Sequence, residues 1–159
     1  MAVSFGPCLW YVKEAKEAAE LYVSVIPNSS IDRIKTLPVD TPSGSAGSVH
    51  IVEFTLAGSP VMAFSGGPHH DFNDATSLMV ECDTQAEIDQ LWDGLLQGGG
   101  KPVQCGWLKD RFGVSWQITP RLLGQMIAGG GKGAQAATLA MMRMVKLDIA
   151  ELERAYSAA

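Results

Sequence analysis

Positively charged residues are scarce in this sequence. Its 159 residues include 12 Lys and Arg against 17 Asp and Glu, which gives a formal net charge of −5. Proteins that bind nucleic acid need clustered Lys and Arg to neutralise phosphates, and no stretch of this sequence gathers them. We therefore expect no nucleic-acid partner.

Long apolar runs and cysteines are also few. No segment has the roughly 20 consecutive apolar residues of a membrane-spanning helix, so we expect no membrane partner. The N-terminal residues lack the basic segment, apolar stretch and small-residue cleavage site of a signal peptide. The three cysteines, Cys8, Cys82 and Cys105, are odd in number and widely spaced. This favours reduced thiols in a cytoplasmic protein over a disulfide framework.

Motifs for nucleotide-type cofactors are missing as well. No predicted strand leads into a glycine-rich turn and helix that would hold a dinucleotide or a methyl-donor cofactor. The segment GGGKG at 129–133 lacks the Ser or Thr after Lys132 that a phosphate-binding loop requires. The sequence therefore predicts no cofactor.

What is present is a pattern that occurs twice: a strand, a helix, and then further strands. The predicted strands of the first half are 5–12, 31–37, 48–56 and 60–65. Those of the second half are 75–82, about 102–108 and 113–119. An offset of 70 residues superposes the helix residues Leu21 on Leu91 and Tyr22 on Trp92. We interpret the pattern as an internal duplication.

The alternation of side chains assigns two faces to each predicted sheet. In the strand at 113–119, Trp116 falls on the apolar face and Gln117 on the opposite one. That second face also carries Met62 and Met79, which are poorly suited to open water. A face that mixes apolar and polar groups is typical of a small-molecule site. Plain solvent exposure, which antiparallel sheets tolerate, is the alternative.

Four segments follow one another along the chain in an order found in a known superfamily. They are FTLAGSPVMAFSGGP (54–68), FNDATSLMVECDTQAEIDQLW (72–92), CGWLKDRFGVSWQITP (105–120) and MVKLDIAELERAY (144–156). Together with the duplication, they resemble the glyoxalase / vicinal oxygen chelate (VOC) superfamily. Within it the sequence is similar to the PhnB-like group, whose members are often labelled demethylubiquinone methyltransferase-like.

The resemblance implies an α+β fold of two βαβββ modules in one chain, followed by a C-terminal helix. We expect the paired modules within 1–128, at about 1–68 and 72–120. A flexible connector is expected at 129–137 and an amphipathic C-terminal helix at 138–157. The apolar stripe of that helix must be covered by its own domain or by a second subunit. The superfamily also implies a homodimer.

The resemblance also implies where a metal would be held. In the metalloenzymes of the superfamily, the first and the last strand of each module each supply one ligand. Carried over to this sequence, these positions fall at Pro7, Met62, Ser77 and Gln117. A divalent metal prefers imidazole, carboxylate or thiolate donors, and none of the four residues supplies one. We therefore expect no metal, although Gln117 can still form hydrogen bonds with a ligand.

The predicted ligand-binding residues are Gln117, Ser77, Met62, Glu53 and Trp107. They suggest a metal-independent small-molecule-binding protein whose ligand is unknown. The alternatives are a divergent VOC enzyme, either a metal-dependent lyase or dioxygenase-like catalyst or one that uses Glu53 as a general base, and a dimeric protein with a vestigial site. Glu53 is either a buried carboxylate with a shifted pKa or an exposed salt-bridge partner. The sequence leaves open whether the protein is an enzyme.

Overall fold

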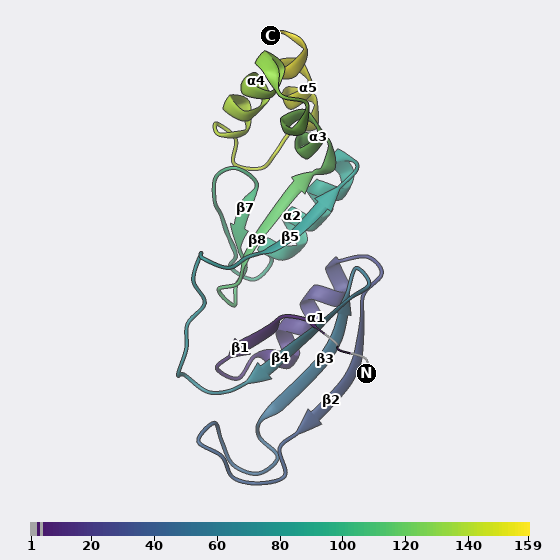
Figure 1. Cartoon of the computed structure of the whole chain (residues 1–159). Coiled ribbons are helices and arrows are strands. Elements are labelled where there is room, and N and C mark those ends of the chain that lie inside the picture. The colour runs from purple at the N-terminus through teal and green to yellow at the C-terminus, as the bar shows by residue number, and fades with distance from the viewer. Residues whose placement is uncertain (1–2, 4) are drawn as a thin grey trace. The chain divides into compact units, whose positions relative to one another are not determined.

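The computed structural model describes residue 3 and residues 5–159, so residues 1, 2 and 4 of the predicted first module lie outside the described part. The chain divides into two compact units, Met1–Phe72 and Asn73–Ala159 (Figure 1). Each unit contains a four-stranded sheet. No helix in the described part of the chain has both the length and the apolar character needed to cross a bilayer.

The first unit has the order β1–α1–β2–β3–β4. Its elements are β1 (Cys8–Tyr11), α1 (Ala15–Val25), β2 (Ser30–Thr36), β3 (His50–Leu56) and β4 (Ser59–Ser65). The strand order in the sheet is β1-β4-β3-β2. Strand β1 runs parallel to β4, and the other neighbouring pairs are antiparallel. This is the predicted βαβββ module.

Helix α1 packs on one face of this sheet because its small and aromatic residues recur at helical spacing. Its buried residues are Ala15, Ala18, Ala19 and Tyr22. The ring centroid of Tyr22 lies 6.5 Å from that of Phe54 on β3. The hydroxyl of Tyr22 lies 3.0 Å from the hydroxyl of Tyr11 on β1. The polar end of this fully buried side chain is therefore satisfied within the core.

The second unit repeats the same order and strand arrangement. Its elements are β5 (Leu78–Cys82), α2 (Gln85–Leu96), β6 (Lys101–Pro102), β7 (Trp107–Lys109) and β8 (Ser115–Pro120). The sheet order is β5-β8-β7-β6, and β5 is parallel to β8. Thr84 caps α2 through a capping box with Glu87, in which each side chain bonds to the other residue's backbone N–H. The two-module fold is thus confirmed.

Trp116 is in the core of the second unit, as its position in the alternating strand predicts. Only 1% of its surface is exposed. Its indole Nε1 donates a hydrogen bond of 2.9 Å to Oδ2 of the buried Asp110. The other oxygen of Asp110 accepts from the backbone N–H groups of Phe112 and Val114. Asp110 thus fixes the tight β7–β8 connection while it satisfies the polar atom of a buried tryptophan.

The C-terminal segment differs from the prediction at 129–137. Instead of a flexible connector, the structure has helices α3 (Arg121–Gly129) and α4 (Gly131–Met141). The glycines allow one sharp turn, because Gly130 has φ of +66° and ends α3. The alanines that follow have the highest helix propensity and continue as α4. Two helices joined by a glycine turn thus stand where the flexible connector is predicted.

The helix predicted at 138–157 is also divided. Helix α5 covers only Ile149–Ser157, because the backbone before it pairs with the segment that leads into β7 of the same unit. The N–H groups of Cys105 and Gly106 each donate a 2.8 Å hydrogen bond, to the carbonyls of Met144 and Val145. A chain held in this way cannot continue a helix.

The predicted apolar stripe is consequently covered only in part. Leu152 is fully buried in a small core that α3, α4, α5 and Leu147 share. Leu139, Met142 and Val145 have exposed fractions of 46–56%. The described structure thus leaves the N-terminal part of the stripe uncovered.

Candidate functional site

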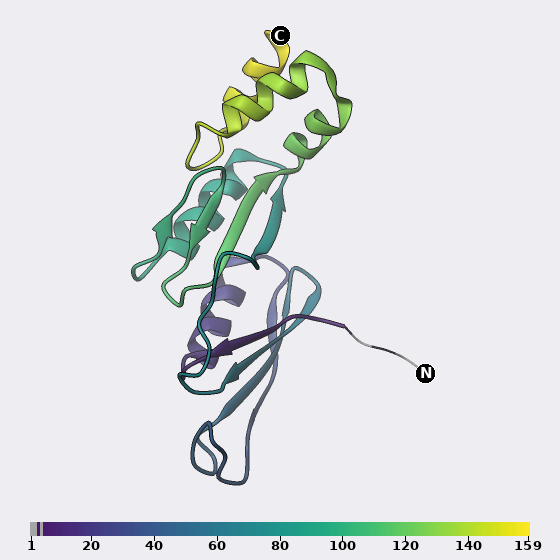
Figure 2. The ribbon, with the colours of Figure 1, turned by 60° about the vertical axis from the view of Figure 1, so that its left-hand side comes forward.

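Each sheet has one face packed against its own helix and one opposite face, which we call the open face. In β4, the side chains of Val61 and Ala63 are buried toward α1, whereas Pro60 and Met62 are exposed on the other side. Figure 2 shows α1 and α2 each on one side of the sheet of its own unit. The open faces are where side chains are available to a ligand.

All five predicted ligand-binding residues lie on these open faces. The first unit brings Glu53 on β3 next to Met62 on β4. The second unit brings Ser77, just before β5, together with Gln117 on β8 and Trp107 on β7. The structure thus arranges the predicted residues as two groups, one in each unit.

The group in the second unit is a row across three strands. Gln117 has Met79 as its Cα partner on β5 and Trp107 as its partner on β7. Its Nε2 donates a 2.8 Å hydrogen bond to Oγ of Ser77. Met79 is 61% exposed, and Trp107 is half-buried. We call Met79, Gln117 and Trp107, with Ser77, the Gln117 row; at about 4.8 Å per strand it spans about 10 Å.

The charged side chains next to the Gln117 row along β5 and β7 are paired. Nζ of Lys109 lies 2.8 Å from a carboxylate oxygen of Asp74. The hydrogen bond from Lys109, with one from Ser115, lowers the pKa of Asp74 and keeps it ionised. Arg121 forms a 2.7 Å ion pair with Glu81. The centre of this open face is therefore uncharged.

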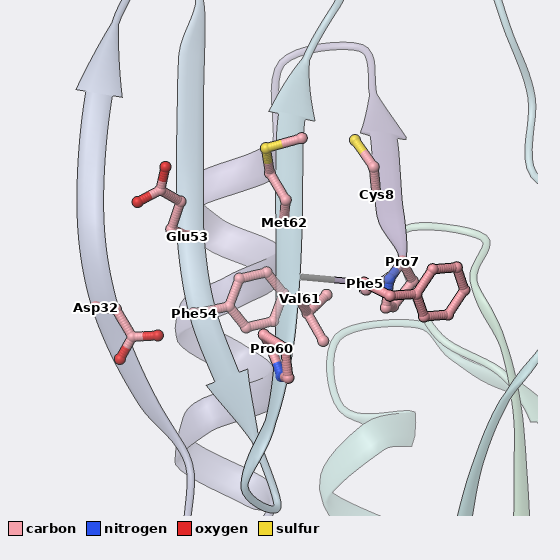
Figure 3. Close-up of a pocket in the computed structure, with 10 residues that line it drawn as sticks. Phe5, Pro7, Cys8, Asp32, Glu53, Phe54, Pro60, Val61 and Met62 are labelled. Atoms are coloured by element: carbon pink, nitrogen blue, oxygen red, sulfur yellow. The ribbon is translucent and has the colours of Figure 1, made fainter. Parts of the chain in front are cut away.

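The group in the first unit is also a row across three strands. Met62 has Cys8 as its Cα partner on β1 and Glu53 as its partner on β3. Figure 3 shows these three side chains on adjacent strands. We call Cys8, Met62 and Glu53 the Met62 row. Partial desolvation of the Cys8 side chain raises the pKa of its thiol, which keeps it neutral at physiological pH.

Glu53 is a salt-bridge partner and not a buried acid. Its side chain is 38% exposed, and it pairs with Lys35 and, at 3.7 Å, with Arg33. The hydrogen bond from Lys35 is the main cause that lowers the pKa of Glu53. A carboxylate stabilised in its charged form is a weaker proton acceptor. The alternative of Glu53 as a buried general base is therefore wrong for this structure.

A pocket of about 430 Å³ adjoins the Met62 row. Its lining includes Pro7, Cys8, Asp32, Glu53, Pro60 and Met62. The volume falls within the range of small-molecule sites. Sequence reasoning missed Cys8 and Asp32. The nearness of Cys8 to Met62 follows from the parallel β1–β4 pairing, and Asp32 lies at a bulge in β2 between Ile31 and Arg33, which periodicity does not reveal.

The open face of the first unit also carries an aromatic contact that sequence reasoning missed. The rings of Trp10 and Phe64 meet edge to face with centroids 4.9 Å apart. Nε1 of Trp10 donates a 2.9 Å hydrogen bond to the carbonyl of Gly67. A Cβ at Gly66 would lie 2.2 Å from the Trp10 ring. Gly66 thus makes room for Trp10 and Gly67 supplies its hydrogen-bond acceptor, so the glycine pair after β4 is the available sequence signal.

The residues at the four superfamily ligand positions do not fit a divalent metal. Ser77 and Gln117 are neutral and share one hydrogen bond. Pro7 offers only its backbone carbonyl, which accepts from the N–H of Met62 at 3.0 Å. Among the described residues, no three His, Cys, Asp or Glu side chains gather in a way that would hold a metal ion. Neutral or soft donors of this kind bind such ions weakly.

A comparison with protein families matches residues 3–119 to the family described as 3-demethylubiquinone-9 3-methyltransferase. No curated protein matches the chain. The family match ends within β8, so α3, α4 and α5 lie beyond the matched region.

Among solved structures, the PhnB protein from Bacillus cereus, which carries the same family description, is 32% identical. The match covers 74% of this chain and 99% of that chain, with a TM-score of 0.65. A protein from Pseudomonas aeruginosa is 18% identical, with 75% and 98% covered and a TM-score of 0.57, which shows a shared fold. A chain from Frankia sp. described as a glyoxylase/bleomycin resistance protein/dioxygenase domain is 11% identical, with 74% and 94% covered and a TM-score of 0.40.

Proposed function

Because the chain belongs to the PhnB-like, 3-demethylubiquinone-9 3-methyltransferase family of the glyoxalase / vicinal oxygen chelate superfamily, we propose that it is a metal-independent small-molecule-binding protein. The observation that carries this proposal is the 2.8 Å hydrogen bond between Gln117 and Ser77. These residues occupy positions where metalloenzymes of the superfamily hold a metal. Here they form a neutral pair suited to hydrogen bonding.

The exposed methionines of the two rows support ligand binding. Met62 is 37% exposed and Met79 is 61% exposed. Each lies beside polar groups, and Met62 also lines the pocket of about 430 Å³. Flexible, polarisable methionine side chains adapt to apolar ligands of varied shape. A mixed apolar and polar lining of this kind is typical of small-molecule sites.

The proposal includes a homodimer in the cytoplasm. The exposed Leu139 and Met142 of the C-terminal segment offer apolar surface that a second copy would cover. Cys8, Cys82 and Cys105 are free thiols, which suits a reducing compartment. Size-exclusion chromatography with light scattering tests the dimer, and a monomer at micromolar concentration would contradict it.

The proposal that the protein functions without a metal is tested by metal analysis of the purified full chain, with Gln117→Ala and Glu53→Ala as variants. We expect less than stoichiometric Zn, Ni, Fe and Mn in all three proteins. A stoichiometric metal that survives purification and is lost in either variant would favour the alternative of a divergent metalloenzyme.

The ligand-binding part is tested by thermal denaturation of the metal-free protein with a library of apolar and aromatic compounds. A compound that binds only the folded state stabilises it by about 2.7 kcal/mol at 100 times its Kd. We expect particular compounds to raise the melting temperature. If no compound does so, and deletion of α5 causes a large loss of stability, the results favour the alternative of a dimeric protein with a vestigial site.

A further inference from the structure

The chemistry of the Gln117 row indicates the class of ligand. Building on the small-molecule function proposed above, we propose that this row binds an uncharged planar aromatic ring that carries a hydroxyl or lactam group. The ring contacts Trp107 and Met79, and its polar group bonds to Gln117 and Ser77. Three features of the second unit lead to this proposal.

The first feature is the direction of the hydrogen bond within the row. Nε2 of Gln117 donates to Oγ of Ser77 at 2.8 Å. The amide oxygen of Gln117 then remains an acceptor, and the hydroxyl proton of Ser77 remains a donor. A ligand group that both donates and accepts complements this pair. A phenolic hydroxyl or the N–H and C=O of a lactam has this property.

The second feature is the apolar flank on each side of the pair. Trp107 is half-buried on β7, and Met79 is 61% exposed on β5. Gln117 is the register partner of both. Indole and thioether side chains both make favourable contacts with aromatic rings. The span of about 10 Å across three strands suits a fused ring system.

The third feature is the neutralised charge beside the row. Lys109, two residues from Trp107, is paired with Asp74 at 2.8 Å. Glu81, two residues from Met79, is paired with Arg121 at 2.7 Å. Lys101 on the edge strand β6 lies opposite Lys109 and not opposite the row. A charged ligand would meet no unpaired counter-charge within the row, and desolvating it there would be costly.

The test compares four compounds that share a fused two-ring carbon skeleton, by isothermal titration calorimetry on the full chain. 2-Naphthol has the ring and the hydroxyl. 2-Methoxynaphthalene lacks the donor, decahydro-2-naphthol lacks the aromatic ring, and 2-naphthoate is charged. We expect 2-naphthol to bind and each analogue to bind about tenfold or more weakly, since one hydrogen bond or one aromatic contact is worth about that factor.

Variants assign the binding to the row. Ser77→Ala, Gln117→Leu and Trp107→Leu are each expected to weaken 2-naphthol about tenfold. Val39→Ala, a change at an exposed residue of the first unit, is the control and should leave the Kd unchanged. If Trp107→Leu fails to fold, Trp107→Phe replaces it. Its affinity for 2-naphthol should lie between the affinities of the natural protein for 2-naphthol and for decahydro-2-naphthol.

Two results would overturn the inference and leave the proposed function standing. One is equal affinity for all four compounds, and the other is unchanged affinity in the three row variants while 2-naphthol still binds. Failure of 2-naphthol to bind would also overturn this ligand class. The proposed function itself is contradicted by other results: a stoichiometric retained metal, or the absence of any stabilising compound in the wider library.

Discussion

The two units share a topology, but the central rows of their open faces differ in chemistry. The Gln117 row is uncharged and hydrogen-bonded within itself. The Met62 row instead contains a neutral thiol, a thioether and a carboxylate paired with two basic side chains. The backbone arrangement is the same in both units, because the core residues on the other face fix it. The residues of the two rows lie outside those cores, and they differ.

The cores of the two units differ in how much they depend on one residue. Trp116 precedes Gln117 as Val61 precedes Met62, and both are buried, with 1% and 7% of their surface exposed. Trp116→Ala should lower the free energy of unfolding by about 3–5 kcal/mol. Val61→Ala should lower it by only about 2 kcal/mol. Urea denaturation measures both, and equal losses would show that the two cores are equivalent.

The aromatic contact of the first unit depends on the glycine after β4. Gly66→Ala would place a Cβ 2.2 Å from the Trp10 ring, so we expect a loss of about 1–3 kcal/mol in unfolding free energy. The control is Gly124→Ala in α3, where an added Cβ meets no atom within 4 Å. That change should stabilise the protein by up to about 1 kcal/mol. Thermal and urea denaturation compare them, and a neutral Gly66→Ala would mean that Trp10 is not held against the backbone.

The smallest expected effect is the pH dependence that the Met62 row contributes. The pKa of Glu53 is lowered from its ordinary value of 4.5, mainly by the hydrogen bond from Lys35. Because the folded-state pKa is the lower one, the unfolded chain binds the proton first. The stabilisation is therefore present above pH 4.5 and is lost as the pH falls through the folded pKa.

Glu53→Gln should remove this contribution. Melting temperatures measured between pH 3 and 7 should then fall less steeply on the acid side than those of the natural protein. Gln117→Leu, which changes the uncharged row, should leave that slope as it is. If the melting temperatures of Glu53→Gln and of the natural protein fall equally steeply at acid pH, the result would contradict the salt bridge.

Residue periodicity predicted much of the fold and the location of the candidate site. The alternation in 113–119 placed Trp116 in the core and Gln117 on the open face, because side-chain direction in a strand depends only on position. Periodicity does not predict the partners of the site residues. Glu53 and Lys35 are 18 positions apart in the sequence and lie on neighbouring strands. Only the register of β2 and β3 reveals that they pair.

The C-terminal segment was the least predictable part. Local composition in 129–137 favoured both flexibility and helix, and packing against α5 decided between them. A Cβ at Gly133 would lie 3.0 Å from Tyr156, so this glycine allows two helices to approach closely. The interruption before α5 arises from backbone hydrogen bonds to Cys105 and Gly106. Such tertiary contacts leave no periodic signal in the sequence.

The claim on which this account depends is that the open faces bind a ligand without a metal. Its most direct test is the Kd of 2-naphthol, or of any compound that raises the melting temperature, measured after EDTA treatment and again with added Zn²⁺ or Ni²⁺. We expect the same Kd in both conditions, because Ser77 and Gln117 bond to each other and offer no strong metal donor. Affinity that disappears with EDTA and returns with the metal would contradict it.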